Sequence, residues 1–434
     1  MKRYEQYKDS GVAWIGEIPA HWETVKPKYT VFLQKGTKPQ ELTDEDNGNL
    51  PYLTMDVLRD RANKTTMYPT SVNDLVKVDD DDILVLWDGA NAGEVLLAKE
   101  GYLSSTMARF GFDTDKLDSR YWFYFLKGLE PILKEFAGGT TIPHLDSSKI
   151  MEEPYPIPSM EEQQAIVRYL DYKVAKLDKL ISENEAQVKE LEKYRTAVIS
   201  EVVTKGLNPD TPMRDSGIEW IGHIPEHWET IKLKYYTSKI GSGVTPTGGA
   251  EVYQENGVIF LRSQNIHNDG LRLEDAAYIS DEIDQQMSNS RVCFGDVLLN
   301  ITGASIGRCH CFDRNIRANV NQHVCIIRPD ASKLNCKYLQ YILNSDMGQI
   351  LIKLGESGAN REGLTFEQIK NFVIPICDIS EQKQIVDVIV AKCNSINQTI
   401  DSLKQNVACL AQYKASLISE TVTGQRDVRD WREK

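Results

Sequence analysis

Cysteine is missing from the first part of this 434-residue chain, and all eight cysteines lie between Cys293 and Cys409. A disulfide framework would not leave half of a chain without bridges, so reduced thiols in a reducing compartment are expected. The chain also lacks any apolar run near the roughly 20 residues that span a bilayer. Its first residues, MKRYE, are not followed by the hydrophobic stretch of a secretory signal. These absences predict a cytoplasmic protein.

The sequence has only one segment that suggests a metal site, Cys309-His310-Cys311. The spacing lacks the two-residue gap of a zinc knuckle, and no second Cys/His pair stands at a matching distance. Alternation along a strand would place Cys309 and Cys311 on one face and His310 on the other. We therefore expect buried thiols in a strand and no bound metal.

Basic residues are outnumbered by acidic ones: the chain has 50 Lys and Arg and 63 Asp and Glu, which gives a net charge of −13. This balance argues against a nucleic-acid binder, whose phosphate contacts need cations, unless the charge is segregated. The acidic run Asp79–Asp82 is an example of segregation, and it is interpreted as a solvated loop before the strand Ile83–Leu86. The length itself predicts two domains of ordinary size.

The strongest positive feature is an internal repeat, which is sought before other patterns. The segment DSGVAWIGEIPAHWET at 9–24 returns as DSGIEWIGHIPEHWET at 215–230, and 15 of 21 positions are identical when the match is extended to Tyr29 and Tyr235. Fainter matches join DILVL at 82–86 to DVLLN at 296–300, and the Ile-Pro, Glu-Gln and Ile-Val pairs after 157 to those after 374. The shift grows from 206 to 219, so the middles differ in length while their frames agree.

A duplicated chain tends to fold with pseudo-two-fold symmetry. Such symmetry suits a bipartite DNA site with two half-sites at a fixed distance. Because the two middles diverge, the half-sites are expected to differ in sequence.

Each copy ends in a segment with helix composition, and residues 160–205 contain neither Pro nor Gly. Apolar residues follow the alternating three-and-four spacing of a coiled coil in both segments. The first series is Leu170, Val174, Leu177, Ile181, Asn184, Val188, Leu191 and Val198, and the second is Ile389, Cys393, Ile396, Ile400, Leu403, Val407, Leu410 and Leu417. Asn184 stands opposite its apolar equivalent Leu403 and is expected to mark the register.

Pairing of the two helices with each other is favoured over packing of each helix on its own domain, because the two series share one frame. About 45 helical residues span roughly 68 Å, and one DNA turn is about 34 Å. An antiparallel pair could therefore hold two domains on one face of a duplex.

The two variable middles, about 30–155 and 236–373, mix short apolar strands, glycine turns and short helices, as α/β (α+β) domains do. Glycine-rich loops follow the buried strands and precede each long helix, where small residues permit close approach to a ligand. Their Asn, Gln, Ser, Thr, His and Arg side chains suit base edges and phosphates. The candidate DNA-binding residues are Trp87, Asn91, Thr140, His144, Arg262, Gln264, Asn265, Thr302, Ser305, Arg308, Asn321, Gln322, Asn360 and Arg361. None of these segments is specific by itself, because glycine-rich turns with Asn and Ser are usually ordinary turns.

Taken together, this plan resembles the specificity subunits of type I restriction-modification systems. The resemblance rests on segments such as WIGEIPAHWE at 14–23, on the closing Ile-Pro, Glu-Gln and Ile-Val pairs and on the long helices, and it covers essentially the whole chain. It implies two target-recognition domains at 1–158 and 207–376, spacer helices at 159–206 and 377–424, and a tail at 425–434.

The resemblance further implies a non-catalytic subunit that directs two methyltransferase subunits, and restriction subunits in a full complex, to double-stranded DNA. S-adenosylmethionine, ATP and Mg²⁺ are then expected only on those partners, and no cofactor or membrane is expected for this chain.

Two other classes of function are kept as alternatives. A stand-alone adenine methyltransferase should show an Asn/Asp-Pro-Pro-Tyr motif, and a motor should show G-x-x-x-x-G-K-[ST]; the chain contains neither. Carboxylates such as Asp88 and Glu94 could serve a nuclease, although acidic turn residues are more often solvated. A coiled-coil adaptor without DNA binding would use Trp14, Trp22, Trp220 and Trp228 as anchors, but these tryptophans suit a core equally well.

Overall fold

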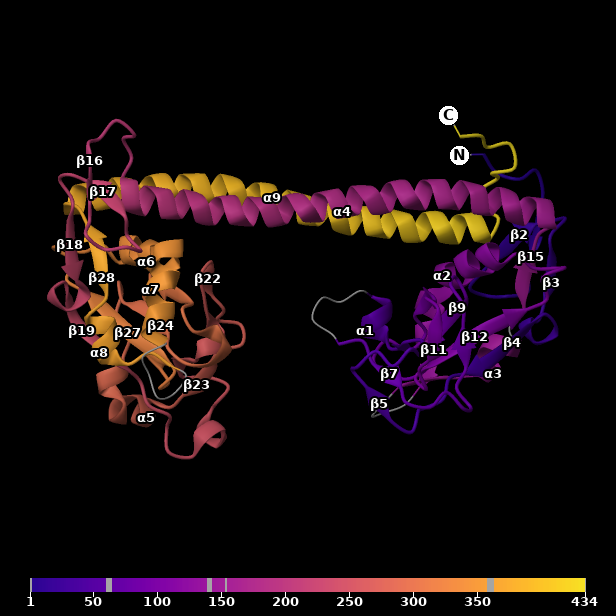
Figure 1. Cartoon of the computed structure of the whole chain (residues 1–434), viewed down its shortest axis with the longest axis horizontal. Coiled ribbons are helices and arrows are strands. Elements are labelled where there is room, and N and C mark those ends of the chain that lie inside the picture. The colour runs from indigo at the N-terminus through magenta and orange to yellow at the C-terminus, as the bar shows by residue number, and fades with distance from the viewer. Residues whose placement is uncertain (1, 60–64, 139–142, 153, 357–362, 434) are drawn as a thin grey trace. The chain divides into compact units, whose positions relative to one another are not determined.

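The computed structural model describes residues 2–59, 65–138, 143–152, 154–356 and 363–433. The chain divides into two compact units, the first made of Met1–Glu185 with Gln405–Lys434 and the second of Ala186–Lys404. Figure 1 shows that each unit combines small sheets and short helices with parts of two long helices. None of the described helices is both long enough and apolar enough to cross a membrane.

The first unit is built on a four-stranded antiparallel sheet. Its strands are β4 (Val31–Lys35), β9 (Ile83–Leu86), β10 (Val95–Leu97) and β12 (Met107–Phe112), in the order β10-β9-β12-β4. The four residues of β9 are all buried, which agrees with their continuous apolar run. Helix α2 (Ser119–Glu135) packs its aromatic face into the same core, and the side chain of its N-cap Asp118 accepts a hydrogen bond from the Tyr121 N–H.

The second unit repeats this sheet with equivalent strands. They are β19 (Thr237–Ser242), β24 (Val297–Asn300), β25 (Cys309–Cys311) and β27 (Val324–Pro329), and the order β25-β24-β27-β19 is the same from edge to edge. Two helices, α6 (Cys336–Asn344) and α7 (Asp346–Glu356), follow in place of α2. The expected duplication and the expected mixed α/β class are both confirmed.

The variable middles differ in a second, smaller sheet. The first unit has β6 (Tyr52–Leu53), β8 (Lys77–Val78) and β11 (Gly101–Leu103), and the second has β20 (Val258–Leu261), β23 (Ala277–Ile279) and β26 (Ala318–Val320). Both contain one parallel pair, β6 with β11 and β20 with β26. The third strand of the first unit, β8, pairs with β11, the later strand of the parallel pair. The third strand of the second unit, β23, pairs instead with β20, the earlier strand. Divergence between the copies is therefore structural as well as chemical.

The remaining elements are short and connect these layers. In the first unit they are β1 (Tyr7–Asp9), β2 (Glu17–Pro19), β3 (Glu23–Val25), η1 (Pro27–Tyr29), β5 (Leu42–Thr43), α1 (Met55–Leu58), β7 (Tyr68–Pro69), β13 (Ala137–Gly138), β14 (His144–Leu145), α3 (Ser147–Glu152) and β15 (Tyr155–Ile157). In the second they are β16 (Met213–Asp215), β17 (His223–Pro225), β18 (Glu229–Lys232), η2 (Leu233–Tyr235), η3 (Gly249–Val252), η4 (Ser263–Asn265), β21 (Ile266–His267), β22 (Gly270–Leu271), α5 (Asp281–Gln286), η5 (Ser288–Ser290), η6 (Gly303–Ser305), α8 (Phe366–Lys370) and β28 (Val373–Ile376).

The repeated sequence motifs have structural roles. Trp22 and Trp228 are fully buried, so these tryptophans belong to the cores. The Gln of each Glu-Gln pair is also buried. Gln163 accepts the Asp118 N–H at 2.8 Å, and Gln382 accepts the Asn335 N–H at the same distance. Each glutamine therefore ties the start of a long helix to the start of the helix that covers the sheet.

The long helices are α4 (Met160–Lys205) and α9 (Ile379–Val422), within the expected ranges 159–206 and 377–424. Segments of the two helices run antiparallel within each unit. In the first unit, Arg426, just beyond α9, donates a hydrogen bond to the Tyr169 hydroxyl, and Lys414 forms an ion pair with Asp178. In the second unit, Lys404 forms an ion pair with Glu192.

All of the expected seam residues are buried or half-buried. This register places Asn184 level with the turn of α9 that contains Leu410. The expectation that Asn184 stands opposite Leu403 is therefore wrong, because antiparallel pairing does not bring equivalent residues together.

The Cys-His-Cys segment forms β25, and its side chains alternate as expected. Cys309 and Cys311 are buried and His310 is half-buried. Burial raises the pKa of the Cys309 thiol well above its usual range. In the described part of the chain, no three His, Cys, Asp or Glu side chains lie close enough together to hold a metal ion.

Candidate nucleic-acid interface

The central strand of each main sheet runs into a glycine-rich loop of the same shape. In the first unit β9 is followed by residues 87–93, and in the second β24 is followed by residues 301–307. Gly89 and Gly93 have φ values of 107° and 91°, and their equivalents Gly303 and Gly307 have 71° and 86°. Side-chain-bearing residues rarely adopt this left-handed region. The glycines therefore fix one loop geometry in both copies.

A second candidate loop meets this one in each unit. Asp88 forms an isolated β-bridge with His144 in the first unit, and Thr302 forms one with Gly363 in the second. His144 and Gly363 occupy equivalent positions before the long helices. The structure thus brings together, within each unit, two loops that the sequence singled out separately. We refer to each meeting point as the loop junction.

The loop junction of the first unit carries charge. Asp88 Oδ1 lies 2.5 Å from His144 Nδ1, and Asp88 Oδ2 accepts a hydrogen bond from Lys35 Nζ at 3.1 Å. Burial opposes ionisation of Asp88, but the hydrogen bonds from His144 and Lys35 outweigh it and lower the pKa of this carboxyl. The Lys35 ammonium also lies over the Trp87 ring, 5.4 Å from its centroid. His144, Lys35 and the nearby Asn91 reach solvent.

The loop junction of the second unit is built from hydroxyl, amide and imidazole groups. Thr302 Oγ1 lies 2.5 Å from His323 Nδ1, and Gln322 Nε2 lies 2.9 Å from His323 Nε2. Thr245 donates its hydroxyl proton to Gln322 Oε1. Hydroxyl, amide and imidazole groups of this kind can read the donor and acceptor pattern of base edges. The same loop also presents exposed Arg308 and half-buried Ser305.

Two of the candidate asparagines have internal roles. Asn265 is fully buried, where it accepts the Arg262 N–H and donates to the Arg272 carbonyl. Asn321 is buried and accepts the His323 N–H at 3.1 Å. Both side chains hold loop shape, so direct contact with a base is not expected of Asn265 or Asn321.

Arg262 and Gln264 precede Asn265 in a segment that lies next to the end of β24. Arg262 is half-buried over the Tyr253 ring, and its guanidinium donates to the Asp275 carbonyl. Gln264 is exposed. The Asn300 side chain donates to the Ser263 carbonyl at 2.8 Å, which ties this segment to the end of β24.

Three candidates, Thr140, Asn360 and Arg361, lie outside the described residues. Four contributors to the junctions were not among the candidates: Lys35, Asp88, Thr245 and His323. Lys35 and Thr245 come from β4 and from the loop after β19, about 50 residues or more before the loops they meet. Nothing in the local sequence indicates that approach, because it depends on strand pairing across the sheet.

A family model described as the type I restriction modification DNA specificity domain matches residues 19–190 and 225–405. The chain is 28% identical over 418 residues to the type I restriction enzyme MjaVIII specificity subunit of Methanocaldococcus jannaschii, with 95% of each chain covered. It is 25% identical to the type I restriction enzyme EcoBI specificity subunit of Escherichia coli, with 91% of this chain and 83% of that one covered.

A solved structure from a study of complex assembly and conformational transition of the type I restriction-modification system has the same fold. The TM-score is 0.69 at 14% identity, with 93% of this chain and 98% of that chain covered.

Proposed function

Because the chain belongs to the type I restriction-modification DNA specificity family, we propose that it recognises an asymmetric, two-part DNA site and brings catalytic partners to it. It acts as a specificity subunit and not as an enzyme. In this proposal residues 1–158 and 207–376 are the recognition domains. The cytoplasm, where reduced thiols persist, is its proposed location.

One observation carries the proposal: the two loop junctions share a backbone frame and differ in chemistry. Both follow the central strand of the main sheet and both use two left-handed glycines. The first presents Lys35, Asp88 and His144, whereas the second presents Thr302, Gln322 and His323. A common frame suits a common ligand, duplex DNA. Unlike side chains suit unlike base sequences.

The net charge of −13 fits a chain that does not rely on phosphate contacts alone. Non-specific affinity for DNA is expected to be low, since carboxylates outnumber cations. Specific binding then draws on base-edge contacts at the junctions and on the cations of partner subunits. A net negative charge is therefore compatible with sequence-specific DNA binding by the assembled complex.

Two methyltransferase subunits are the proposed partners, joined by restriction subunits in a full complex. Exposed tyrosines recur at equivalent positions of the two copies: Tyr29 and Tyr235 are 71% and 65% exposed, and Tyr194 and Tyr413 are 57% and 51% exposed. Surfaces that are kept in both copies suit two copies of one partner, because aromatic side chains are common binding anchors. S-adenosylmethionine, ATP and Mg²⁺ are proposed to bind those partners only.

The test is to incubate the purified chain with duplex DNA and a labelled methyl donor, with and without a methyltransferase subunit of the same system. Methyl transfer is expected only when both proteins are present. A gel shift at stated salt is expected to show sequence-specific binding of the assembled complex. Methyl transfer by the chain alone, or an assembled complex that binds all sequences equally, contradicts the proposal.

A further inference from the structure

The first Glu of the repeated Glu-Gln motif forms the same contact in both units. Glu162 lies 2.9 Å from His21 Nε2, and its equivalent Glu381 lies 2.9 Å from His227 Nε2. Both carboxylates are held near the start of a long helix. The surroundings of these two glutamates nevertheless differ.

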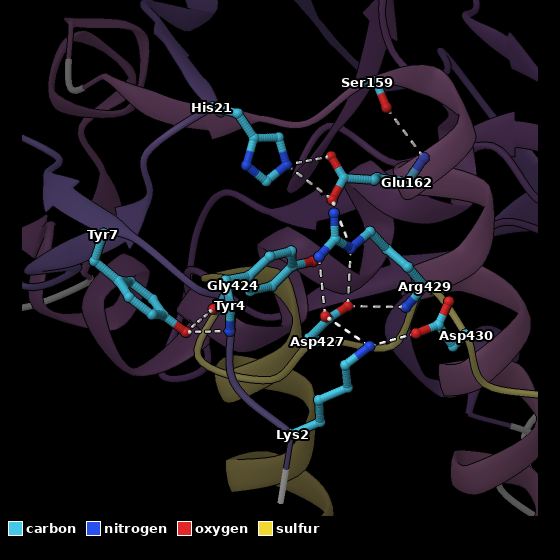
Figure 2. A network of polar contacts seen from close by, with 10 residues as sticks. All are labelled: Lys2, Tyr4, Tyr7, His21, Ser159, Glu162, Gly424, Asp427, Arg429 and Asp430. Carbon is cyan, nitrogen blue, oxygen red and sulfur yellow. Dashed lines mark hydrogen bonds and ion pairs between the residues drawn. The ribbon is translucent and has the colours of Figure 1, made fainter.

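In the first unit an arginine from the C-terminal tail joins the glutamate. Arg429 Nε lies 3.8 Å from Glu162 Oε1, and the guanidinium lies over the Tyr4 ring at 4.8 Å from its centroid. Asp427 accepts hydrogen bonds from Arg429 Nε and Nη2, both at 3.0 Å. Figure 2 shows the guanidinium between the Glu162 and Asp427 carboxylates.

The tail that carries this arginine is anchored on both sides. The Asp427 N–H donates to the Lys2 carbonyl at 3.0 Å, and the Lys2 ammonium pairs with Asp427 and Asp430. The Trp431 ring packs against the Tyr169 and Tyr172 rings, at 5.4 Å and 5.2 Å between centroids. The glutamate site of the first unit is therefore filled by an extended segment of the same chain.

The second unit has the same frame without that segment. Gly206 and Gly424 end the two long helices with φ of 75°, against equivalent Pro and Trp side chains. After Gly206 a short link, residues 207–212, leads directly to β16, the equivalent of β1. It replaces both the C-terminal tail and the first residues of the chain.

A cavity of about 330 Å³ lies beside Glu381 as a result. Asn208 and Thr211 of the link line one side, and Asp378, Glu381 and Gln384 line the other. Among the described side chains, Glu381 contacts His227 and the Trp228 indole, and no lysine or arginine forms an ion pair with it. Lys205 also lines the cavity, but among the described residues it forms no ion pair with Glu381, which therefore lacks the paired cation that Glu162 has in Arg429.

We propose that this cavity is a binding site for an arginine side chain on an extended segment of a partner protein. The site takes the arginine as Glu162 takes Arg429, with the carboxylate of Glu381 facing the guanidinium. Charge complementarity and the filled equivalent in the same chain both support this occupant. The proposal goes beyond DNA recognition and does not depend on it.

A partner of different sequence fits this site better than the tail of a second copy. The tail is anchored by Trp431 on Tyr169 and Tyr172, and the equivalent positions of the second unit are Val388 and Ala391. Without those rings the tryptophan loses its packing partners. The occupant is therefore expected to share the arginine of the tail and not its tryptophan.

The contacts of the glutamate differ between the unit that has the arginine and the unit that lacks it. In the second unit, which has no such arginine, Glu381 Oε2 contacts His227, and Glu381 Oε1 accepts a hydrogen bond from the Trp228 indole N–H at 3.1 Å. With one, both oxygens of Glu162 face His21, and the Trp22 indole nitrogen has no partner among the described residues. Binding at the second site is expected to draw Glu381 away from Trp228.

The test uses the full-length chain and a fluorescent synthetic peptide with the sequence of residues 424–434 in which Trp431 is replaced by Ala, so that it supplies the arginine without the tryptophan. Anisotropy is expected to show saturable binding. Arg429→Ala in the peptide, or Glu381→Gln in the chain, should weaken binding at least about ten-fold, since each removes one side of a charged pair. Glu255→Gln, at an exposed glutamate of the same unit, should leave binding unchanged.

A second variant, Asn208→Arg, guards against loss of folding in Glu381→Gln. It supplies an arginine from the rim of the cavity and is expected to block the peptide while the chain keeps its melting temperature. Absence of saturable binding would overturn the proposal. So would binding that survives both variants, or binding that is lost only in Glu162→Gln, because the peptide would then have exchanged into the first unit.

Discussion

Individual residues of the repeat can be explained once their partners are known. Gln382 is buried at the start of α9, where its side chain accepts the Asn335 N–H and donates to the carbonyls of Lys333 and Cys377. The repeat shows that the residue is kept in both copies. The sequence does not reveal that it joins three segments, because the segments meet only in the folded unit.

Gln382→Ala should therefore destabilise the second unit by about 2–4 kcal/mol, because three backbone groups that are partly or fully buried lose their partner. Urea unfolding of the full chain, followed by the transition of that unit, measures the effect. The matched control is Gln384→Ala, two residues further along the same helix and exposed, for which a change below about 0.5 kcal/mol is expected. Equal effects in the two variants would contradict this role.

Asp284 of α5 provides a prediction about pH. Its side chain is 1% exposed and accepts hydrogen bonds from Arg291, Arg317 and Asn319. Burial opposes ionisation, but the contacts with Arg291, Asn319 and Arg317 outweigh it and lower the pKa of Asp284. A lowered folded-state pKa stabilises the fold above the ordinary carboxyl pKa of about 4, and this contribution is lost as the pH falls through the folded-state value.

Asp284→Asn should thus cost about 1.5–3 kcal/mol at pH 7, the range for hydrogen bonds to a charged group. The stability of the variant should also fall less steeply than that of the parent between pH 5 and pH 3. Thermal unfolding across this range tests both statements. Asp275→Asn, at an exposed side chain, should follow the parent curve; a parent curve that is flat below pH 5 would refute the assignment.

Gln322 is the exposed amide of the second loop junction, and it is oriented by Thr245 and His323. An amide in this setting can bond the N6 and N7 edge of adenine. Gln322→Ala in the assembled complex should cost about 1–3 kcal/mol in specific DNA binding and relax the preference at one base pair. Competition gel shifts with single-base variants of the site measure this.

The control for that experiment is Gln254→Ala, an exposed glutamine elsewhere in the same domain, which should change neither affinity nor preference. If Gln322→Ala lowers affinity equally for all sequences, then Gln322 contacts the DNA backbone and does not read a base.

At the scale of elements, hydrophobic periodicity was sufficient to predict the two long helices and insufficient to predict which residues meet across them. The seam residues from Leu170 to Leu417 lie at buried or half-buried positions of α4 and α9, because helical periodicity depends only on local spacing. The partner of Asn184 could not be found in this way. Its neighbour depends on the direction in which α9 runs, and a shared frame is compatible with either direction.

The same limit applies to the loops: their local turns could be predicted, and their long-range contacts could not. The glycines of residues 87–93 and 301–307 predicted tight turns correctly, since left-handed φ values favour glycine. The approach of Lys35 to Asp88, and of Thr245 to Gln322, could not be predicted. Each contact depends on which strands become neighbours in the sheet, and single-sequence patterns do not specify strand order.

The long helices carry their own prediction. Deleting seven residues at the same level from both α4 and α9 shortens the paired segment by about 10 Å, close to three base pairs at 3.4 Å each. The complex should then accept a DNA site whose unspecified middle is about three base pairs shorter, with both half-site sequences unchanged. Methylation of a set of duplexes with graded spacers measures the permitted length.

Deletion from only one helix provides the control, because it breaks the seam register and should abolish assembly. A change in half-site preference after the double deletion would mean that the helices do more than set a spacing.

At the scale of the whole molecule, duplication and divergence have separate consequences. What the copies share, such as Trp22 with Trp228 and Gln163 with Gln382, is buried and maintains the frame. What differs is the set of side chains at the two junctions: Lys35 and Asp88 in the first, and Thr302 and Gln322 in the second. A protein organised in this way can present two different recognition surfaces on one repeated frame.

The most direct test of this account is to map methylated adenines across the genome of a host that carries the chain and its methyltransferase. The account predicts a single split motif, with two unlike specified halves separated by a fixed number of unspecified base pairs. A continuous palindrome, or two identical halves, would contradict it, because the two loop junctions would then read the same sequence.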